Sequence, residues 1–247
     1  MDETLALIKQ VYDMLRCLSW NEDISSFSTK MSIHYLSTYL TTDWLSDLHE
    51  SQSLDLLQQE IHQKGKDGLE VDVGDVFFIL KLKEISNRPS NYASGPQYAW
   101  LWKKGQEFRD GTFNTFAVIS NIGGNHWVSI VVNFQASHIY YGDSLGIIID
   151  KELEDAVLTW WIHYHTTHYF MVENLLIIHQ QDMHSCGVLA WNTIMVHLFL
   201  ETHQLFNPQS IVYERLKIFL QIANQHNEKV RISFCTLNHP HILTLLT

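Results

Sequence analysis

The chain has 247 residues, of which 46% are hydrophobic and 12% aromatic, including eight tryptophans. This composition is sufficient for a full core and excludes long disordered stretches. The formal net charge is −11 and only 16 residues are Lys or Arg, which argues against binding to a nucleic acid and favours a basic partner instead.

We expect neither a membrane span nor an export signal from this sequence. Its longest nearly apolar stretch, residues 186–200, contains Asn192 and His197 and falls short of the roughly 20 residues that cross a bilayer. Asp2 and Glu3 stand where a secretory signal has basic residues. We therefore expect no association with a membrane.

Cysteine usage indicates a reducing compartment. The three cysteines, Cys17, Cys186 and Cys235, are an odd number and have no CxxC spacing. This pattern suits neither a disulfide framework nor a four-thiolate zinc site. We expect the protein in the cytoplasm or the nucleus.

The N-terminal part of the chain reads mainly as helix. Residues 1–18 and 53–64 have the spacing of amphipathic helices, and the short apolar run 76–82 fits either a strand or the end of a helix. Residues 86–111 contain two prolines, three glycines and scattered aromatics, which predicts a long surface connection with a mobile loop.

Strand signals follow in the middle of the chain. Runs at 116–120, 127–134 and 138–141 are rich in β-branched and aromatic residues, and short turn-forming segments separate them. They predict a meander of antiparallel strands. A further strand is predicted at 175–178.

Helices alternate with these strands toward the C-terminus. Residues 152–170 have helical length, with Asp150 as a possible N-cap, and further helices are predicted at 186–200 and about 208–224. Because no internal repeat is visible, the order of elements indicates one α+β domain over residues 1–247.

Cys186 is the first candidate for chemistry. It opens a run that is apolar on nearly every side, as expected of a helix buried in a core. A helix N-terminus offers unpaired N–H groups and about half a positive charge, which favour a thiolate. The alternative is a small buried hydrophobic residue, the commoner role of a lone cysteine.

The segment before Cys186 is a polar loop between two apolar runs, the kind of segment on which catalytic groups are often placed. A side-chain amide in this loop is a candidate donor to an oxyanion. Gln180 and its neighbour Gln181 both supply such an amide.

His126 and Asp143 are candidates to complete a catalytic triad. His126 immediately precedes one predicted strand and Asp143 follows the next, so a hairpin brings them side by side. A carboxylate in that place fixes the imidazole tautomer and stabilises its cation. The alternatives are that Asp143 merely stabilises a turn and that another of the fifteen histidines is used.

A metal site is the less favoured interpretation of the histidines. His163, His165 and His168 cluster in one predicted helix, but only His165 and His168 have the spacing of one helical face. We expect solvated histidines, no metal and no cofactor.

Taken together, the motifs resemble the Ulp/sentrin-specific protease family. His126-Trp127 is followed seventeen residues after the histidine by the Asp143-Ser144 pair, and Gln180 lies six positions before Cys186. A segment that begins at Trp44 resembles the family's Trp-Leu-Asn-Asp segment. The resemblance spans about residues 44–200, so a family-like core of about 40–205 would carry accessory helical segments at 1–40 and 205–247.

The resemblance implies a papain-like cysteine protease fold of the ubiquitin-like-protease type, in which a central sheet has flanking helices and a buried helix carries the nucleophile. It also implies roles: Cys186 as nucleophile, His126 as general base and then acid, Asp143 as orienting carboxylate, and Gln180 in the oxyanion hole with the Cys186 N–H. Trp127 and Trp44 match tryptophans that cover a tunnel for the Gly-Gly backbone. For Trp44, ordinary core packing remains an equal alternative.

The sequence departs from the family pattern just before the nucleophile. Ser185 stands where the family usually has Asp, and residues 182–184 lack the usual Asn-Gly turn. Neither change removes a catalytic atom. A displaced oxyanion donor would nevertheless weaken activity, since losing one costs about two to three decades in rate.

The expected activity is cleavage after the C-terminal Gly-Gly of a ubiquitin-like modifier, with SUMO as the first candidate and a monomeric enzyme. Ubiquitin and NEDD8 are the alternatives, because they end in Arg-Gly-Gly and an acidic enzyme suits that arginine. Two other classes stay open: an acyltransferase, and an inactive module that binds a modifier without cleaving it.

Overall fold

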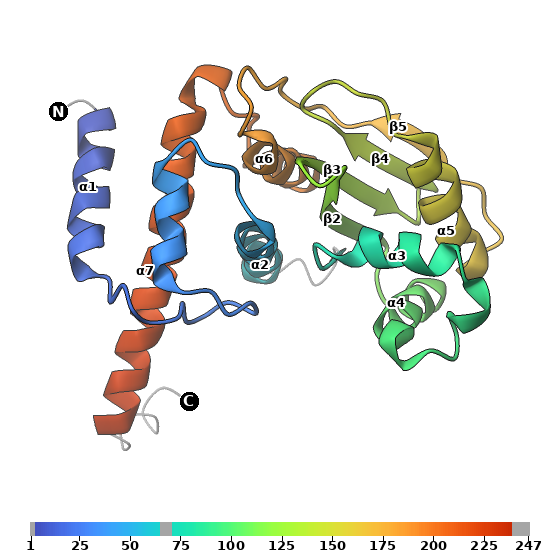
Figure 1. Ribbon diagram of the computed structural model, residues 1–247, viewed down its shortest axis with the longest axis horizontal. Coiled ribbons are helices and arrows are strands. Elements are labelled where there is room, and N and C mark those ends of the chain that lie inside the picture. Colours follow the sequence, from blue (N-terminus) through green and yellow to red (C-terminus); the bar gives the residue numbers. More distant parts are fainter. Residues whose placement is uncertain (1–2, 65–70, 239–247) are drawn as a thin grey trace. The chain divides into compact units, whose positions relative to one another are not determined.

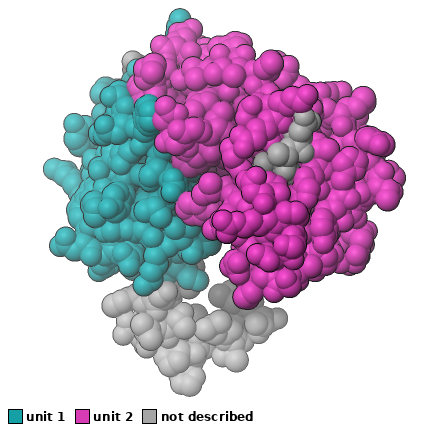
Figure 2. All heavy atoms as spheres, turned by 45° about the vertical axis from the view of Figure 1, so that its right-hand side comes forward, with its two compact units in different colours: residues 1–52, 209–247 teal, residues 53–208 magenta. Residues whose placement is uncertain are grey.

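The computed structural model describes residues 3–64 and 71–238 (Figure 1). Contacts within the chain divide it into two compact units (Figure 2). Unit 1 combines Met1–Gln52 with Gln209–Thr247, and unit 2 is Ser53–Pro208. The division falls inside helix α2 (Asp47–Gln63), which begins six residues before the helix predicted at 53–64.

Unit 1 is helical. Helix α1 (Glu3–Cys17) packs against α7 (Ile211–Asn238), and the 3-10 segment η1 (Ile33–Leu40) also contacts α7. The predicted N-terminal helix is thus present. The predicted helix at 208–224 is too short, because a 3-10 turn, η5 (Pro208–Ser210), precedes a helix that runs on to residue 238.

Unit 2 is built on a mixed five-stranded sheet in the order β1-β2-β3-β4-β5. Strands β2 (Thr115–Ile122), β3 (His126–Asn133) and β4 (His138–Gly142) form the predicted antiparallel meander. The edge strands β1 (Val71–Val73) and β5 (Met171–Asn174) run parallel to their neighbours.

The strand predicted at 175–178 is wrong, because β5 ends at Asn174. Leu175 still donates its N–H to the Tyr141 carbonyl at 2.7 Å, after which the chain leaves the sheet and Leu176 is exposed. An edge strand needs few apolar side chains, so its sequence is less apolar than the run that follows it. The strand was therefore predicted at the more apolar residues 175–178.

Helices cover both faces of the sheet (Figure 1). One face packs into a core with α3 (Phe78–Ser86), α4 (Ala99–Arg109) and α5 (Trp160–His165). Alternate residues of β3, such as Val128 and Ile130, belong to that core. Helix α6 (Cys186–Leu198) contacts β2 and β3. The observed fold class is α+β, as predicted.

The predicted surface connection at 86–111 is wrong. The segment contains two 3-10 turns, η2 (Pro89–Asn91) and η3 (Pro96–Tyr98), followed by α4, and Tyr92 and Leu101 are fully buried. The prolines occupy first-turn positions of the short helices, where the missing N–H costs nothing. They mark boundaries between elements, so the segment is ordered and part of the core.

Gly105 explains why a glycine stands inside α4. A Cβ at this position would collide with the His165 ring, so glycine permits the two helices to approach closely. A glycine that reads as a loop signal in the sequence therefore serves helix packing.

Two further helix predictions need adjustment. The run at 76–82 belongs to a helix, since α3 begins at Phe78. The helix predicted at 152–170 ends at His165 and is a π-helix, η4 (Glu152–Thr159), before it becomes α5. Asp150 accepts the Glu154 N–H through its backbone carbonyl at 2.9 Å.

Over the described residues, no helix is long and apolar enough to pass through a bilayer.

Candidate active site

His126 stands at the first position of β3 because of a tight turn. Gly123 and Gly124 both have positive φ, 64° and 81°, a conformation that glycine adopts without steric cost. The turn pairs Ile122 with His126 and fixes the register of the hairpin. A local sequence signal, Gly-Gly before a strand, thus determines where the imidazole lies.

Asp143 directly follows β4. Gly142 pairs with Ser129, so the same register places Asp143 opposite Val128, two residues from His126. His126 Nε2 lies 2.8 Å from Asp143 Oδ1, and both residues are buried. The sheet therefore brings together two residues that are 17 apart in the chain.

The pair is electrostatically coupled. Burial lowers the pKa of His126, but hydrogen bonds to Asp143 and Cys186 outweigh it and raise the pKa to about 9. Burial raises the pKa of Asp143, but the bond to His126 and the backbone N–H of Leu145 outweigh it and hold that pKa below its ordinary value. At neutral pH the arrangement favours imidazolium beside carboxylate.

Cys186 is the first residue of α6 and is 4% exposed. Its side chain hydrogen-bonds with His126. Every residue of α6 from Cys186 to Val196 is buried, which holds the N-terminus of the helix, with its partial positive charge, in a fixed place. Thiol, imidazole and carboxylate thus form one hydrogen-bonded line.

Gln180 is half-buried, and both ends of its side-chain amide are engaged. Ser144 Oγ donates to Gln180 Oε1 at 2.7 Å, and Gln180 Nε2 donates to the Asp182 carbonyl at 3.0 Å. The Gln180 backbone N–H also donates to the Ser144 carbonyl at 2.9 Å. Gln181, the other candidate amide, is exposed.

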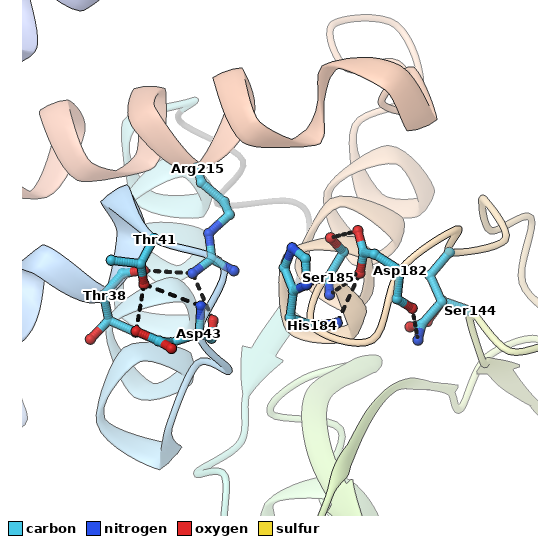
Figure 3. Close-up of polar contacts among 9 residues, drawn as sticks. Thr38, Thr41, Asp43, Ser144, Asp182, His184, Ser185 and Arg215 are labelled. Carbon is cyan, nitrogen blue, oxygen red and sulfur yellow. Dashed lines mark hydrogen bonds and ion pairs between the residues drawn. The ribbon is translucent and has the colours of Figure 1, made fainter.

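Residues 182–185 form a compact turn around one carboxylate (Figure 3). Asp182 accepts hydrogen bonds from the backbone N–H groups of His184 and Ser185 and from the Ser185 hydroxyl. The sequence identified this loop as a departure from the family pattern but did not assign a role to Asp182 or Ser144. Both contact Gln180, Ser144 through its hydroxyl and Asp182 through its carbonyl, and no spacing rule reveals these contacts.

The two tryptophans differ in their surroundings. Trp127 lies in β3 and is 5% exposed, whereas Trp44 belongs to unit 1 and is 47% exposed. Core packing therefore does not account for Trp44. Its segment is fixed within unit 1 by Arg215, which donates to the carbonyls of Thr38 and Asp43 at 2.6 and 2.8 Å (Figure 3).

The expectation of solvated histidines is wrong for His165. His165 is buried at the end of α5, and its Nε2 lies 2.8 Å from Tyr92 Oη. Burial lowers the pKa of His165 to about 4, so the ring stays neutral. No group of metal-binding side chains is present among the described residues.

A scan of protein-family profiles and a search of curated proteins find no match to this sequence. Solved structures do match. The SUMO protease Ulp1 with its catalytic cysteine oxidized to a sulfenic acid superposes with a TM-score of 0.66 at 15% identity, over 88% of this chain and 94% of that one. The C-terminal Ulp1 protease domain in complex with Smt3, the yeast ortholog of SUMO, gives 0.62 at 16% identity, over 87% and 94%.

The Ulp1-like SUMO protease catalytic domain of Chaetomium thermophilum gives a TM-score of 0.63 at 13% identity, over 89% of this chain and 88% of that one. At these identities the likeness concerns the fold. The chain has the fold of the Ulp1-type proteases, the fold that the sequence motifs led us to expect.

Proposed function

We propose that this chain is a cysteine protease that cleaves after the C-terminal glycine of a ubiquitin-like modifier. The observation that carries the proposal is the hydrogen-bonded line of Cys186, His126 and Asp143, with the thiol at the N-terminus of a buried helix. The chain that carries these three residues has a fold shared with SUMO proteases.

In the first half of the reaction, the Cys186 thiolate attacks the carbonyl carbon of the terminal glycine. The negative charge moves to the carbonyl oxygen, which accepts hydrogen bonds from the Cys186 backbone N–H and Gln180 Nε2. His126 then gives its proton to the departing lysine amine as the C–N bond breaks. A thioester between Cys186 and the modifier remains.

In the second half, neutral His126 takes a proton from water, and the resulting hydroxide attacks the thioester carbon. The C–S bond breaks, the thiolate returns, and the modifier leaves with a free carboxylate. Asp143 holds the ring in the tautomer that serves both steps, through its 2.8 Å contact with Nε2.

SUMO is the modifier that we propose first, because the three matching structures described above are SUMO proteases. Ubiquitin and NEDD8 are the alternatives, in view of the net charge of −11. The buried Trp127 of unit 2 is proposed to contact the glycine tail, where a side chain larger than hydrogen would be excluded beside it. The exposed Trp44 of unit 1 is proposed to contact the modifier.

The proposal is tested with SUMO, ubiquitin and NEDD8 that carry a C-terminal propargyl group, which forms a stable bond with an attacking thiolate. The protein is incubated with each probe, and intact mass is measured. Cys186→Ala is compared with Cys17→Ala, which removes an exposed cysteine outside the site. Hydrolysis of the corresponding fluorogenic conjugates is measured in parallel.

We expect a single adduct with SUMO in the wild type and in Cys17→Ala, and none in Cys186→Ala. An adduct with ubiquitin or NEDD8 alone would reassign the modifier and keep the reaction. No adduct and no hydrolysis with any of the three would refute the proposal. Binding without reaction would then favour the inactive modifier-binding module, and acyl transfer from an added acyl donor would favour the acyltransferase.

A further inference from the structure

The Asp182 carboxylate is the centre of the turn that precedes the candidate nucleophile. Its Oδ1 accepts from the N–H groups of His184 and Ser185, each at 2.8 Å, and its Oδ2 accepts from Ser185 Oγ at 2.6 Å. Three short bonds to one carboxylate fix the backbone from residue 182 to residue 185. The following residue is Cys186.

The backbone of Asp182 controls the other donor of the proposed oxyanion hole. Its carbonyl accepts Gln180 Nε2 at 3.0 Å, while Ser144 Oγ holds Gln180 Oε1 at 2.7 Å. This pair of contacts determines which end of the amide carries the N–H groups. One residue therefore contacts both the amide of Gln180 and the residue that joins the turn to Cys186.

The Asp182 carboxylate does not bond to the backbone N–H of Cys186. It accepts from residues 184 and 185 but not from the Cys186 N–H that would face an oxyanion. The hydrogen bonds of Asp182 therefore bear on the geometry of the turn and not on the Cys186 thiol.

We propose that Asp182 is a positioning residue, which sets the place of the Gln180 amide relative to the Cys186 N–H and so builds the oxyanion hole. The proposal rests on the proposed protease function. It gives a role to Asp182 and Ser185, which lie in the segment where the sequence departs from the family pattern. Asp182 itself does not touch the substrate.

The test compares two properties of the same variants. Turnover of a fluorogenic modifier conjugate depends on the oxyanion hole, whereas alkylation of Cys186 by iodoacetamide depends on the thiolate and His126. Both are measured for the wild type, Asp182→Ala, Asp182→Asn and Ser185→Ala. Asp110→Ala, an exposed carboxylate outside the turn, is the matched control. Alkylation is followed at the Cys186 peptide, so that the other cysteines do not contribute.

In Asp182→Ala we expect kcat to fall about 10- to 100-fold, which is less than complete loss of an oxyanion donor costs. KM and the alkylation rate should stay within about twofold of the wild type, because substrate binding and the thiolate are unaffected. Asp182→Asn should recover most of kcat, since its amide oxygen still accepts both N–H groups and its NH2 can donate to Ser185. Ser185→Ala, which loses one bond, should fall about 3- to 10-fold.

The outcomes separate this inference from the proposed function. If the wild type cleaves no conjugate, the protease proposal fails. If the wild type cleaves and Asp182→Ala cleaves equally fast, or loses turnover and alkylation in proportion, the positioning role is refuted. If Asp182→Ala does not fold, Asp182→Asn and Ser185→Ala decide: a wild-type kcat in Ser185→Ala, or a kcat in Asp182→Asn below that of Ser185→Ala, contradicts the proposal.

Discussion

His126 shows how the site is tuned at the scale of single residues. Burial alone would leave the ring neutral, as it does at His165, where burial lowers the pKa to about 4. The bonds to Asp143 and Cys186 reverse this effect at His126 and raise its pKa to about 9. Two buried histidines of one chain thus carry different charges at neutral pH, because only one has a carboxylate beside it.

Asp143→Asn should shift the pH dependence of turnover. His126 must be protonated to expel the amine, so kcat/KM of the wild type should fall as the pH rises through about 9. Without the carboxylate, the pKa of His126 falls, and this alkaline limb should move down by about one unit or more, with kcat lower by roughly two to four decades. Asp110→Asn is the control. An unchanged alkaline limb in Asp143→Asn would contradict the assigned role.

The same pKa affects stability with a defined sign. The folded-state pKa of His126 lies above its ordinary value of 6.5. The stabilisation is therefore complete below about pH 6.5 and is lost as the pH rises through about 9. The loss adds to the fall in activity on the alkaline side.

At the scale of elements, the site depends on how closely β4 approaches α6. A Cβ at Gly142 would collide with Ser129 Oγ and would press on Leu175 and on Thr193 of α6. Ser129 Oγ also donates to the Gly142 carbonyl at 3.1 Å. Glycine at this position keeps β4 against its neighbours and so fixes the start of the Asp143 turn.

Gly142→Ala should destabilise the protein by about 1–3 kcal/mol, as overpacking of a tight contact does. Because Asp143 is the next residue, kcat should fall as well. Adding Ser129→Ala removes the nearest clashing atom, so the double variant should regain part of both losses. Urea denaturation and turnover assays measure the two effects. Equal stability of Gly142→Ala and the wild type, or no recovery in the double variant, would refute this account.

At the scale of the whole molecule, the two units have different architectures. Unit 2 contains Cys186, His126, Asp143 and Gln180, and its sheet is covered on both faces. Unit 1 joins the first and last parts of the chain, and Arg215 of α7 is one link between them. Arg215 is 1% exposed, and its guanidinium donates to the carbonyls of Thr38, Tyr39 and Asp43.

Arg215→Met should destabilise unit 1 by about 2–4 kcal/mol, because buried carbonyls lose a charged donor. Hydrogen exchange should then accelerate in residues 38–46 and 211–224 while β3 stays protected. KM should also rise if the segment carrying Trp44 contacts the modifier, as proposed. The control is Arg109→Met, whose partner Asp110 is exposed and whose loss should cost less than about 0.5 kcal/mol. Unchanged exchange in residues 38–46 would contradict this role of Arg215.

Local patterns were sufficient for the central part of the fold, whereas the choice of candidate residues also drew on the resemblance to the Ulp/sentrin-specific protease family. Runs of β-branched and aromatic residues between turn-forming segments predicted the three antiparallel strands, and the uninterrupted apolar run after Cys186 predicted a buried helix. The Gly-Gly turn before His126 and the strand end before Asp143 placed both side chains correctly in the topology. Each of these features depends on residues within a few positions of one another, which a sequence displays directly.

Only the tertiary structure decided the remaining features. Residues 86–111 looked like a loop because the partners that bury them, such as Trp161 against Tyr92, lie 69 positions away. Ser144 orients Gln180 from 36 positions away, and His165 is buried through a contact with Tyr92 that spans 73. The Asp182 turn is local, yet it gains importance only because Gln180 and Cys186 lie at its two ends. The sequence by itself determined the meander, the buried helix and the candidate residues; the long-range contacts decided burial, charge and the positioning of the donors, because these depend on what packs against each group.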